Sequence, residues 1–299
     1  MLGQESTFRS EVSLVRVEVD VRERSAPVAN LKKDDFRIVD EGKVQTVVAV
    51  GQEEVPLEIV LLIDTGPNMR EIVGKLVAAT DSALGELRES DQVAIIVFDA
   101  QCKTKTITDF TNDRKSLTSA IQSHLNSGDL YAGTKTVGCA QPLHALNPAA
   151  QAIASRAKSN RRRAIIGISD DRGPGTAGRL VREAVHELWN ADVVVLSLGL
   201  KTDFKEFHIG PPFRGMRFAA DQTGGDRVDF EDAPKGLSEA IQRLRSRYSL
   251  FYAPPPGKPG EERRISVGLA RNAAKEHKNA SVRSRTGYVV PSPQSAGTQ

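Results

Sequence analysis

Hydrophobic and polar residues follow two different periods along this chain, and the change of period divides it. Between residues 12 and 22, valines alternate with charged residues, which predicts a strand with one buried and one solvated face. Asp40, Glu41 and Gly42 then separate two short β-rich runs, the pattern of a hairpin. We therefore expect antiparallel β structure in the first 50 residues.

From Pro56 onward, apolar runs of strand length alternate with segments of helical spacing. The run Leu57–Asp64, LEIVLLID, is almost entirely apolar, as in a strand covered on both faces of a parallel sheet. Further strands are expected at residues 91–98, 104–108, 163–169, 192–198 and 227–230. Strands and helices that alternate at least four times indicate an α/β fold with a doubly wound, mainly parallel sheet.

Local signals set the ends of some expected helices. Thr111 or Asn112 is expected to be the N-cap of the helix that follows. Residues 201–216 have few regular apolar positions and are interpreted as a surface loop, and a helix is expected only at residues 218–223, before two glycines.

After this α/β stretch, strand patterns return at residues 265–269, 281–285 and 288–290. We expect the two β flanks to pair into one small β module, because neither offers enough strands for independent stability. The expected division is residues 8–54 as N-terminal β flank, 55–247 as central domain, 248–291 as C-terminal β flank and 292–299 as a disordered tail.

Composition narrows the class of protein. Of 299 residues, 39% are apolar and 26% charged, which suits a soluble globular chain. A net charge of +3 is too small to favour nucleic acid or an anionic membrane as a partner, and no apolar window reaches the length of a transmembrane segment. Cys102 and Cys139 could pair, but fit no metal pattern and are interpreted as ordinary thiols. The run Arg161–Arg163 is interpreted as a solvated surface patch.

Polar side chains gather in three loops that should follow strands of the parallel sheet. These loops are residues 64–68, 133–136 and 169–170, and the carboxyl ends of parallel strands meet at one edge. Oxygen ligands from Asp, Asn and Thr, without His or Cys, suit a hard cation such as magnesium. Asp64 is equally placed to cap the helix after its loop, so a structural role stays open.

These pieces in this order resemble von Willebrand factor type A domains. The likeness lies in an apolar strand that ends in Asp-Thr, then DQVAIIVF, then ISDD. More narrowly, LKKDDFRIVDEGK, AADQTGGDRVDF, YSLFYAP and VRSRTGYVVP are similar to the bacterial von Willebrand factor A-related family that is frequent in Acidobacteria. The likeness spans roughly residues 8–291. It implies an adhesion, assembly or scaffolding protein that engages a protein partner outside the cytoplasm.

The family's metal-ion-dependent adhesion site uses Asp-x-Ser-x-Ser in the first loop, a threonine in the second and an aspartate in the third. The magnesium ligands that the resemblance implies here are Asp64, Asn68, Thr134 and Asp170. Gly66 and Asn68 stand where the family has serines, and glycine offers no side-chain oxygen. Thr136 is an alternative in the second loop, and Asp171 lies beside the third-loop aspartate. We expect a degenerate site that binds Mg²⁺ weakly or not at all, with an intact site as the alternative.

Three functions remain in competition. The first is a non-enzymatic protein-binding module that uses the loop edge, and the second is a structural or scaffolding subunit without metal. The third is a hydrolase or phosphoryl-transfer enzyme that depends on Asp64. A phosphatase of the haloacid dehalogenase type wants a second aspartate where Gly66 stands, and no phosphate-binding loop or nucleophile elbow is present. We therefore expect a binding module and no enzyme activity.

Localisation is a conflict between two expectations. The resemblance implies a secreted or periplasmic protein, whereas the first residues, MLGQESTFRS, lack a basic stretch followed by an apolar one. A cytoplasmic protein is the alternative.

Overall fold

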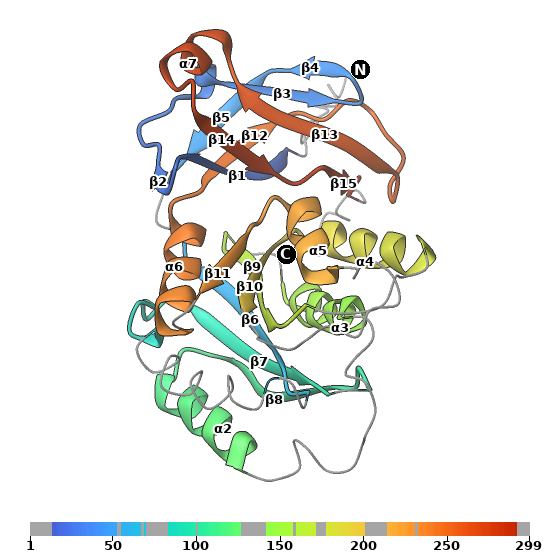
Figure 1. The fold of residues 1–299 in the computed structure, drawn as a ribbon. Helices are drawn as coiled ribbons and strands as arrows, with labels where there is room; N and C mark the ends of the chain where they lie inside the picture. The colour runs from blue at the N-terminus through green and yellow to red at the C-terminus, as the bar shows by residue number, and fades with distance from the viewer. Residues whose placement is uncertain are drawn as a thin grey trace, which may run out of the picture.

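A six-stranded sheet forms the centre of the protein (Figure 1). The computed structural model describes residues 14–52, 55–66, 69, 83–99, 101–126, 142–157, 160–171, 178–200, 214–230 and 233–291. The strands, in sheet order, are β11 (Arg227–Phe230), β10 (Val193–Leu200), β9 (Arg162–Ser169), β6 (Leu57–Asp64), β7 (Gln92–Phe98) and β8 (Thr104–Thr111). Neighbouring strands run parallel except β8, which is antiparallel to β7. The predicted doubly wound, mainly parallel sheet is confirmed.

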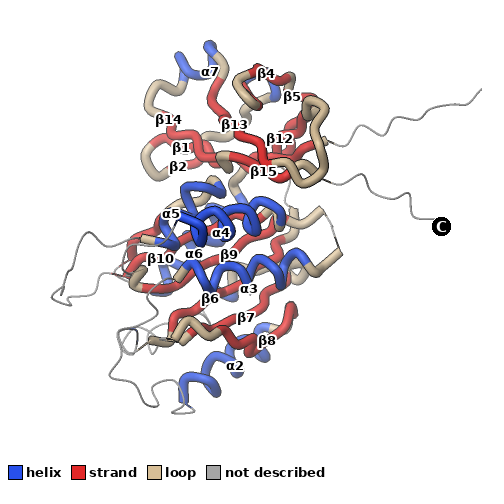
Figure 2. Tube along the Cα trace, turned by 90° about the vertical axis from the view of Figure 1, so that its right-hand side faces the viewer, coloured by secondary structure: helices blue, strands red, loops and turns tan. Residues whose placement is uncertain are grey.

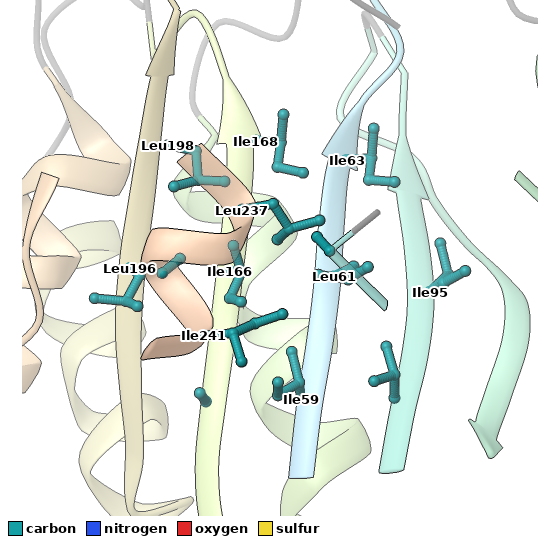
Figure 3. Close-up of a cluster of buried hydrophobic side chains, with 14 of the residues drawn as sticks. Ile59, Leu61, Ile63, Ile95, Ile166, Ile168, Leu196, Leu198, Leu237 and Ile241 are labelled. Atoms are coloured by element: carbon teal, nitrogen blue, oxygen red, sulfur yellow. The ribbon is translucent and has the colours of Figure 1, made fainter. Parts of the chain in front are cut away.

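Helices cover both faces of this sheet (Figures 1 and 2). One core contains side chains from α3 (Leu143–Ala154), α4 (Gly178–Asn190) and α5 (Gly215–Thr223), and the other contains side chains from α2 (Arg114–Asn126) and α6 (Ala233–Arg245). In β6, Leu61 faces the core that includes Ile241 of α6 (Figure 3). The next residue, Leu62, belongs to the opposite core. This alternation with period two explains why the strand is apolar throughout.

The two ends of the chain form a separate β module that lies above the central sheet in Figure 1. Its first sheet has the order β14 (Ala280–Ser284), β1 (Val15–Glu23), β12 (Tyr248–Tyr252) and β5 (Val47–Gly51), with β2 (Ala26–Pro27) paired to β1. Its second sheet has the order β15 (Gly287–Val289), β13 (Glu262–Leu269), β3 (Phe36–Asp40) and β4 (Lys43–Gln45). The short helices η1 (Lys33–Asp35) and α7 (Arg271–Glu276) complete the module, and α7 was not expected from the sequence.

Strand β1 pairs antiparallel with both β12 and β14, so backbone pairing runs between the flanks. The predicted β module, with its hairpin at β3 and β4, is therefore confirmed. The division of the chain into four numbered segments stays a prediction, and residues 292–299 lie outside the described part. None of the described helices combines the length and apolarity that crossing a membrane requires.

The prediction that β1 has a solvated face is wrong. Its charged side chains are buried: Glu18 is 7% and Asp20 is 3% exposed. The interpretation of Arg161–Arg163 as a solvated patch is wrong for two of the three residues, since Arg162 and Arg163 are buried. Arg162 Nε lies 2.7 Å from Glu18 Oε2, because the polar face of β1 packs on the start of β9 rather than facing water. An alternating sequence does not show which surface covers its polar side.

Two local predictions also differ from the structure. The cap of α2 is Asp113, whose Oδ1 accepts hydrogen bonds from the N–H groups of Lys115 (3.0 Å) and Ser116 (3.3 Å). Thr111 is not the cap, because α2 begins only at Arg114 and Thr111 Oγ1 accepts a hydrogen bond of 3.1 Å from the Asp113 N–H. Cys102 is disulfide-bonded rather than an ordinary thiol. Cys139 lies outside the described residues.

Candidate functional site

The carboxyl ends of β6 and β9 place Asp64 beside the segment Ser169–Asp171. In the parallel register, Ile63 pairs with Ile168, so Asp64 and Ser169 are level with each other. Asp64 Oδ2 accepts a hydrogen bond of 2.8 Å from Ser169 Oγ, and Asp64 Oδ1 accepts one of 2.8 Å from the Gly66 N–H. Asp64 thus closes the turn after β6 and is tied to the neighbouring strand.

Two carboxyl groups are buried together at this edge. Asp64 is 7% and Asp170 is 8% exposed. Burial raises the pKa of Asp64 to about 7, and the negative charge of Asp170 acts in the same direction, against the hydrogen bonds from Gly66 and Ser169. Near neutral pH, Asp64 is therefore divided between its protonated and ionised forms, and a positively charged ligand would favour the ionised form.

Asp171 has a different role from its neighbour. Its Oδ1 accepts a hydrogen bond of 2.8 Å from the Met216 N–H, and its Oδ2 accepts one of 3.0 Å from the Arg217 N–H. These N–H groups belong to the first turn of α5 and have no partner within the helix. Asp171 therefore anchors the start of α5, which explains why this helix begins at Gly215 and not at residue 218 as the sequence predicted. The contact spans 45 positions in the chain, so local sequence signals do not reveal it.

A further carboxylate at this edge, Asp99, was missed by the sequence interpretation. It directly follows β7, as residue 170 follows β9, and this position after a buried strand was the signal available. Its Oδ1 accepts hydrogen bonds from the N–H groups of Gln101 (2.8 Å) and Lys103 (2.9 Å) and so holds the turn into β8. Thr65 also has a structural role at this edge, because its N–H and Oγ1 both donate to the Phe98 carbonyl at 2.9 Å.

The structure brings together half of the predicted magnesium ligands. Asp64 and Asp170 lie at one edge, whereas Asn68 and Thr134 fall outside the described residues. Within the described ranges, no three His, Cys, Asp or Glu side chains are grouped so that they could hold a metal ion. A Cβ at Gly66 would lie 3.0 Å from Asp64 Oδ1, so the missing side chain lets this carboxylate fold back onto its own turn. The oxygen atoms of the described residues are the kind of ligand that a hard cation prefers, but they are fewer than such a cation needs.

In a comparison with protein families, residues 59–173 match the family described as von Willebrand factor type A domain. No curated protein matches the chain.

Several solved structures are similar to the chain. An aerotolerance-related membrane protein from Bacteroides fragilis NCTC 9343, with multiple mutations to serines, is 17% identical, with a TM-score of 0.48, covering 63% of this chain and 98% of that one. BatB, a conserved hypothetical protein from Bacteroides thetaiotaomicron, is 21% identical, with a TM-score of 0.46 and coverage of 63% and 98%. A protein described as von Willebrand factor type A from Catenulispora acidiphila is 12% identical, with a TM-score of 0.47 and coverage of 95% and 76%.

The matched residues run from β6 through β9 and include Asp64, Ser169, Asp170 and Asp171. Over this segment, which is less than half of its length, the chain is similar to von Willebrand factor type A domains.

Proposed function

We propose that this chain is a non-enzymatic protein-binding module that engages a protein partner through the edge at the carboxyl ends of β6 and β9. The observation that carries the proposal is the pair of buried carboxyl groups, Asp64 and Asp170, at that edge. Ionised Asp64 is costly in this buried position, and a positively charged group of a ligand or partner would offset that cost. The match of residues 59–173 to a family with an adhesion site supports the same edge.

We propose further that the cation site at this edge is degenerate. Gly66 contributes no oxygen, and both oxygens of Asp64 already accept hydrogen bonds from the protein. Mg²⁺ prefers six oxygen ligands in octahedral geometry, so a site short of a ligand should bind it weakly. If no cation binds, the module acts as a scaffolding subunit that contacts its partner directly.

We also propose that the protein works in an oxidising compartment, outside the cytoplasm. The disulfide at Cys102 supports this, because disulfides persist in secreted and periplasmic proteins and are rare in the cytosol. The narrower likeness to the Acidobacterial family points to the same location. We expect titration of the denatured protein, without reductant, to find no free thiol, and two free thiols per chain would contradict the proposal.

The binding proposal is tested by partner retention. The immobilised full chain, Asp64→Ala and a control, Asp109→Ala, are incubated with extract of the source cells. Asp109 is exposed on β8, toward the opposite end of the sheet, so its substitution removes one charge without touching the edge. We expect the wild-type chain and the control to retain the same protein, and Asp64→Ala to lose it.

Chelator separates the two versions of the proposal. Loss of the partner on chelation assigns binding to a cation at the edge, and retention assigns it to direct contact. Titration of the same three proteins with Mg²⁺ should then give weak binding at most, and none for Asp64→Ala. Equal retention by all three proteins would contradict a partner site at this edge.

A further inference from the structure

Helix α5 lies between the candidate site and the β module. In Figures 1 and 2 it packs beside the central sheet and directly below the strands that the chain's end contributes. With nine residues it is only about 14 Å long. Hydrogen bonds hold both ends of α5. The candidate site holds the first turn, and the β module holds the last residues.

The first turn of α5 is held by a residue next to the candidate site. Asp171 binds two N–H groups of its first turn, as described above. The Asp171 N–H in turn donates to Ser169 Oγ at 3.0 Å, and Ser169 Oγ donates to Asp64. A continuous series of hydrogen bonds therefore joins the Asp64 carboxyl group to the start of α5. Asp171 holds this position with φ of +50°, a conformation uncommon for residues other than Gly, Asn and Asp.

The last residues of α5 contact the β module. The Gln222 carbonyl accepts a hydrogen bond of 3.0 Å from the Thr286 N–H, and Thr223 forms a β-bridge with Arg285. Gly224 ends the helix with φ of +75°, and a Cβ there would lie 2.3 Å from the carbonyl carbon of Ser284. The backbone of α5 is thus in direct contact with the segment between β14 and β15, and only glycine fits this approach.

The chain's only tryptophan lies at this same junction. Trp189 of α4 is 3% exposed, and its Nε1 donates to the Gln222 carbonyl at 3.0 Å. A Cβ at Gly287 would lie 2.5 Å from Trp189 Cη2, and Arg264 of β13 stacks 4.9 Å from the centre of the indole ring. Any separation of the β module from α5 therefore changes the surroundings of Trp189.

We propose that α5 is a strut, a short rigid element that couples the loop edge at Asp64 and Asp170 to the contact between α5 and the β module. A change at the edge that loosens the hold of Asp171 on α5 loosens the contact with β14 and β15, and the coupling acts equally in the reverse direction. The coupling free energy comes from two sets of hydrogen bonds to the backbone of one short helix, one set at each end. The proposal concerns contacts within the chain and stands whether the edge binds a cation, a protein or neither.

The test replaces Asp171 by Asn in the full chain. Asn tolerates positive φ and keeps one acceptor for the first turn of α5, but its NH2 group replaces the other acceptor and faces an N–H donor, so the variant loses one charged hydrogen bond. We expect a red-shifted Trp189 emission under native conditions, and about tenfold faster amide exchange at Thr286 and Gly225 than in the wild type. The matched control is Asp113→Asn, which makes the same substitution at the N-cap of α2, on the far side of the sheet (Figure 1).

The reverse direction uses Thr286→Val, which removes the 2.8 Å hydrogen bond from Thr286 Oγ1 to Gln222 Oε1 and keeps the shape of the side chain. We expect faster exchange of the Met216 and Arg217 N–H groups, although these lie at the other end of α5. The strut is supported if each variant affects the distant end and Asp113→Asn affects neither. It is overturned if Asp171→Asn speeds exchange only within the first turn of α5, or if Asp113→Asn changes Trp189 equally.

Discussion

Replacing Arg162 by Met should lower the free energy of unfolding by about 3 to 5 kcal/mol, the range for breaking a buried ion pair. Arg162 is 1% exposed, and its guanidinium donates to Glu18 and to the backbone carbonyls of Leu244, Arg245 and Arg247. These partners come from β1, from the last two residues of α6 and from the link between α6 and β12, so one side chain of the central sheet is tied to the β module. Met fills a similar volume but leaves a buried carboxylate and several carbonyl groups without their donor.

Denaturant titration of the full chain measures this loss. The control is Arg179→Met, because Arg179 is on the surface and pairs with Glu183 one helical turn away. Exposed pairs of this kind contribute little to stability, because water and salt screen them. Equal midpoints for the two variants would show that the buried network does not join the two parts of the fold.

Replacing Asp64 by Asn should change how stability depends on pH. The carboxyl group keeps its proton up to pH about 7 in the folded state, whereas in the unfolded chain it ionises near pH 4. At Asp64 the folded state therefore binds more protons than the unfolded state between these values, and the contribution of this group to stability falls as pH rises from about 4 to 7. Since a pKa unit corresponds to about 1.4 kcal/mol, this loss amounts to at most about 4 kcal/mol.

The asparagine side chain does not ionise, so Asp64→Asn should be more stable than the wild type at pH 8 and similar to it at pH 4. Thermal or denaturant unfolding at a series of pH values compares the two, with Asp109→Asn as an exposed control that keeps the wild-type profile. A variant that is less stable than the wild type at pH 8 would mean that ionised Asp64 stabilises the fold, contrary to its burial beside Asp170.

Sequence patterns predicted the elements whose structure depends on residues close to one another in the chain. The apolar run at β6 and the turn at Asp40–Lys43 are of this kind, since periodicity and turn residues act over a few positions. Such patterns failed where distant surfaces meet. Glu18 and Arg162 are 144 positions apart, and nothing near either residue in the chain indicates that the other covers it.

The same limit applies to the candidate site. That Asp64 and Asp170 lie at one edge followed from strand order, because carboxyl ends of parallel strands meet. Which oxygen accepts which hydrogen bond did not follow, and the sequence places Asp171 only beside the third-loop aspartate, with no sign that it holds α5. Adjacent aspartates with different tasks are distinguished only by partners that the three-dimensional structure supplies.

NMR titration of the side-chain carboxyl carbons shows whether Asp64 is buried at the edge beside a second carboxyl group. We expect Asp64 to titrate near pH 7, and Asp170→Asn to lower this pKa because a neighbouring negative charge is removed. An Asp64 resonance that titrates near pH 4, equally in wild type and Asp170→Asn, would rule out this buried pair.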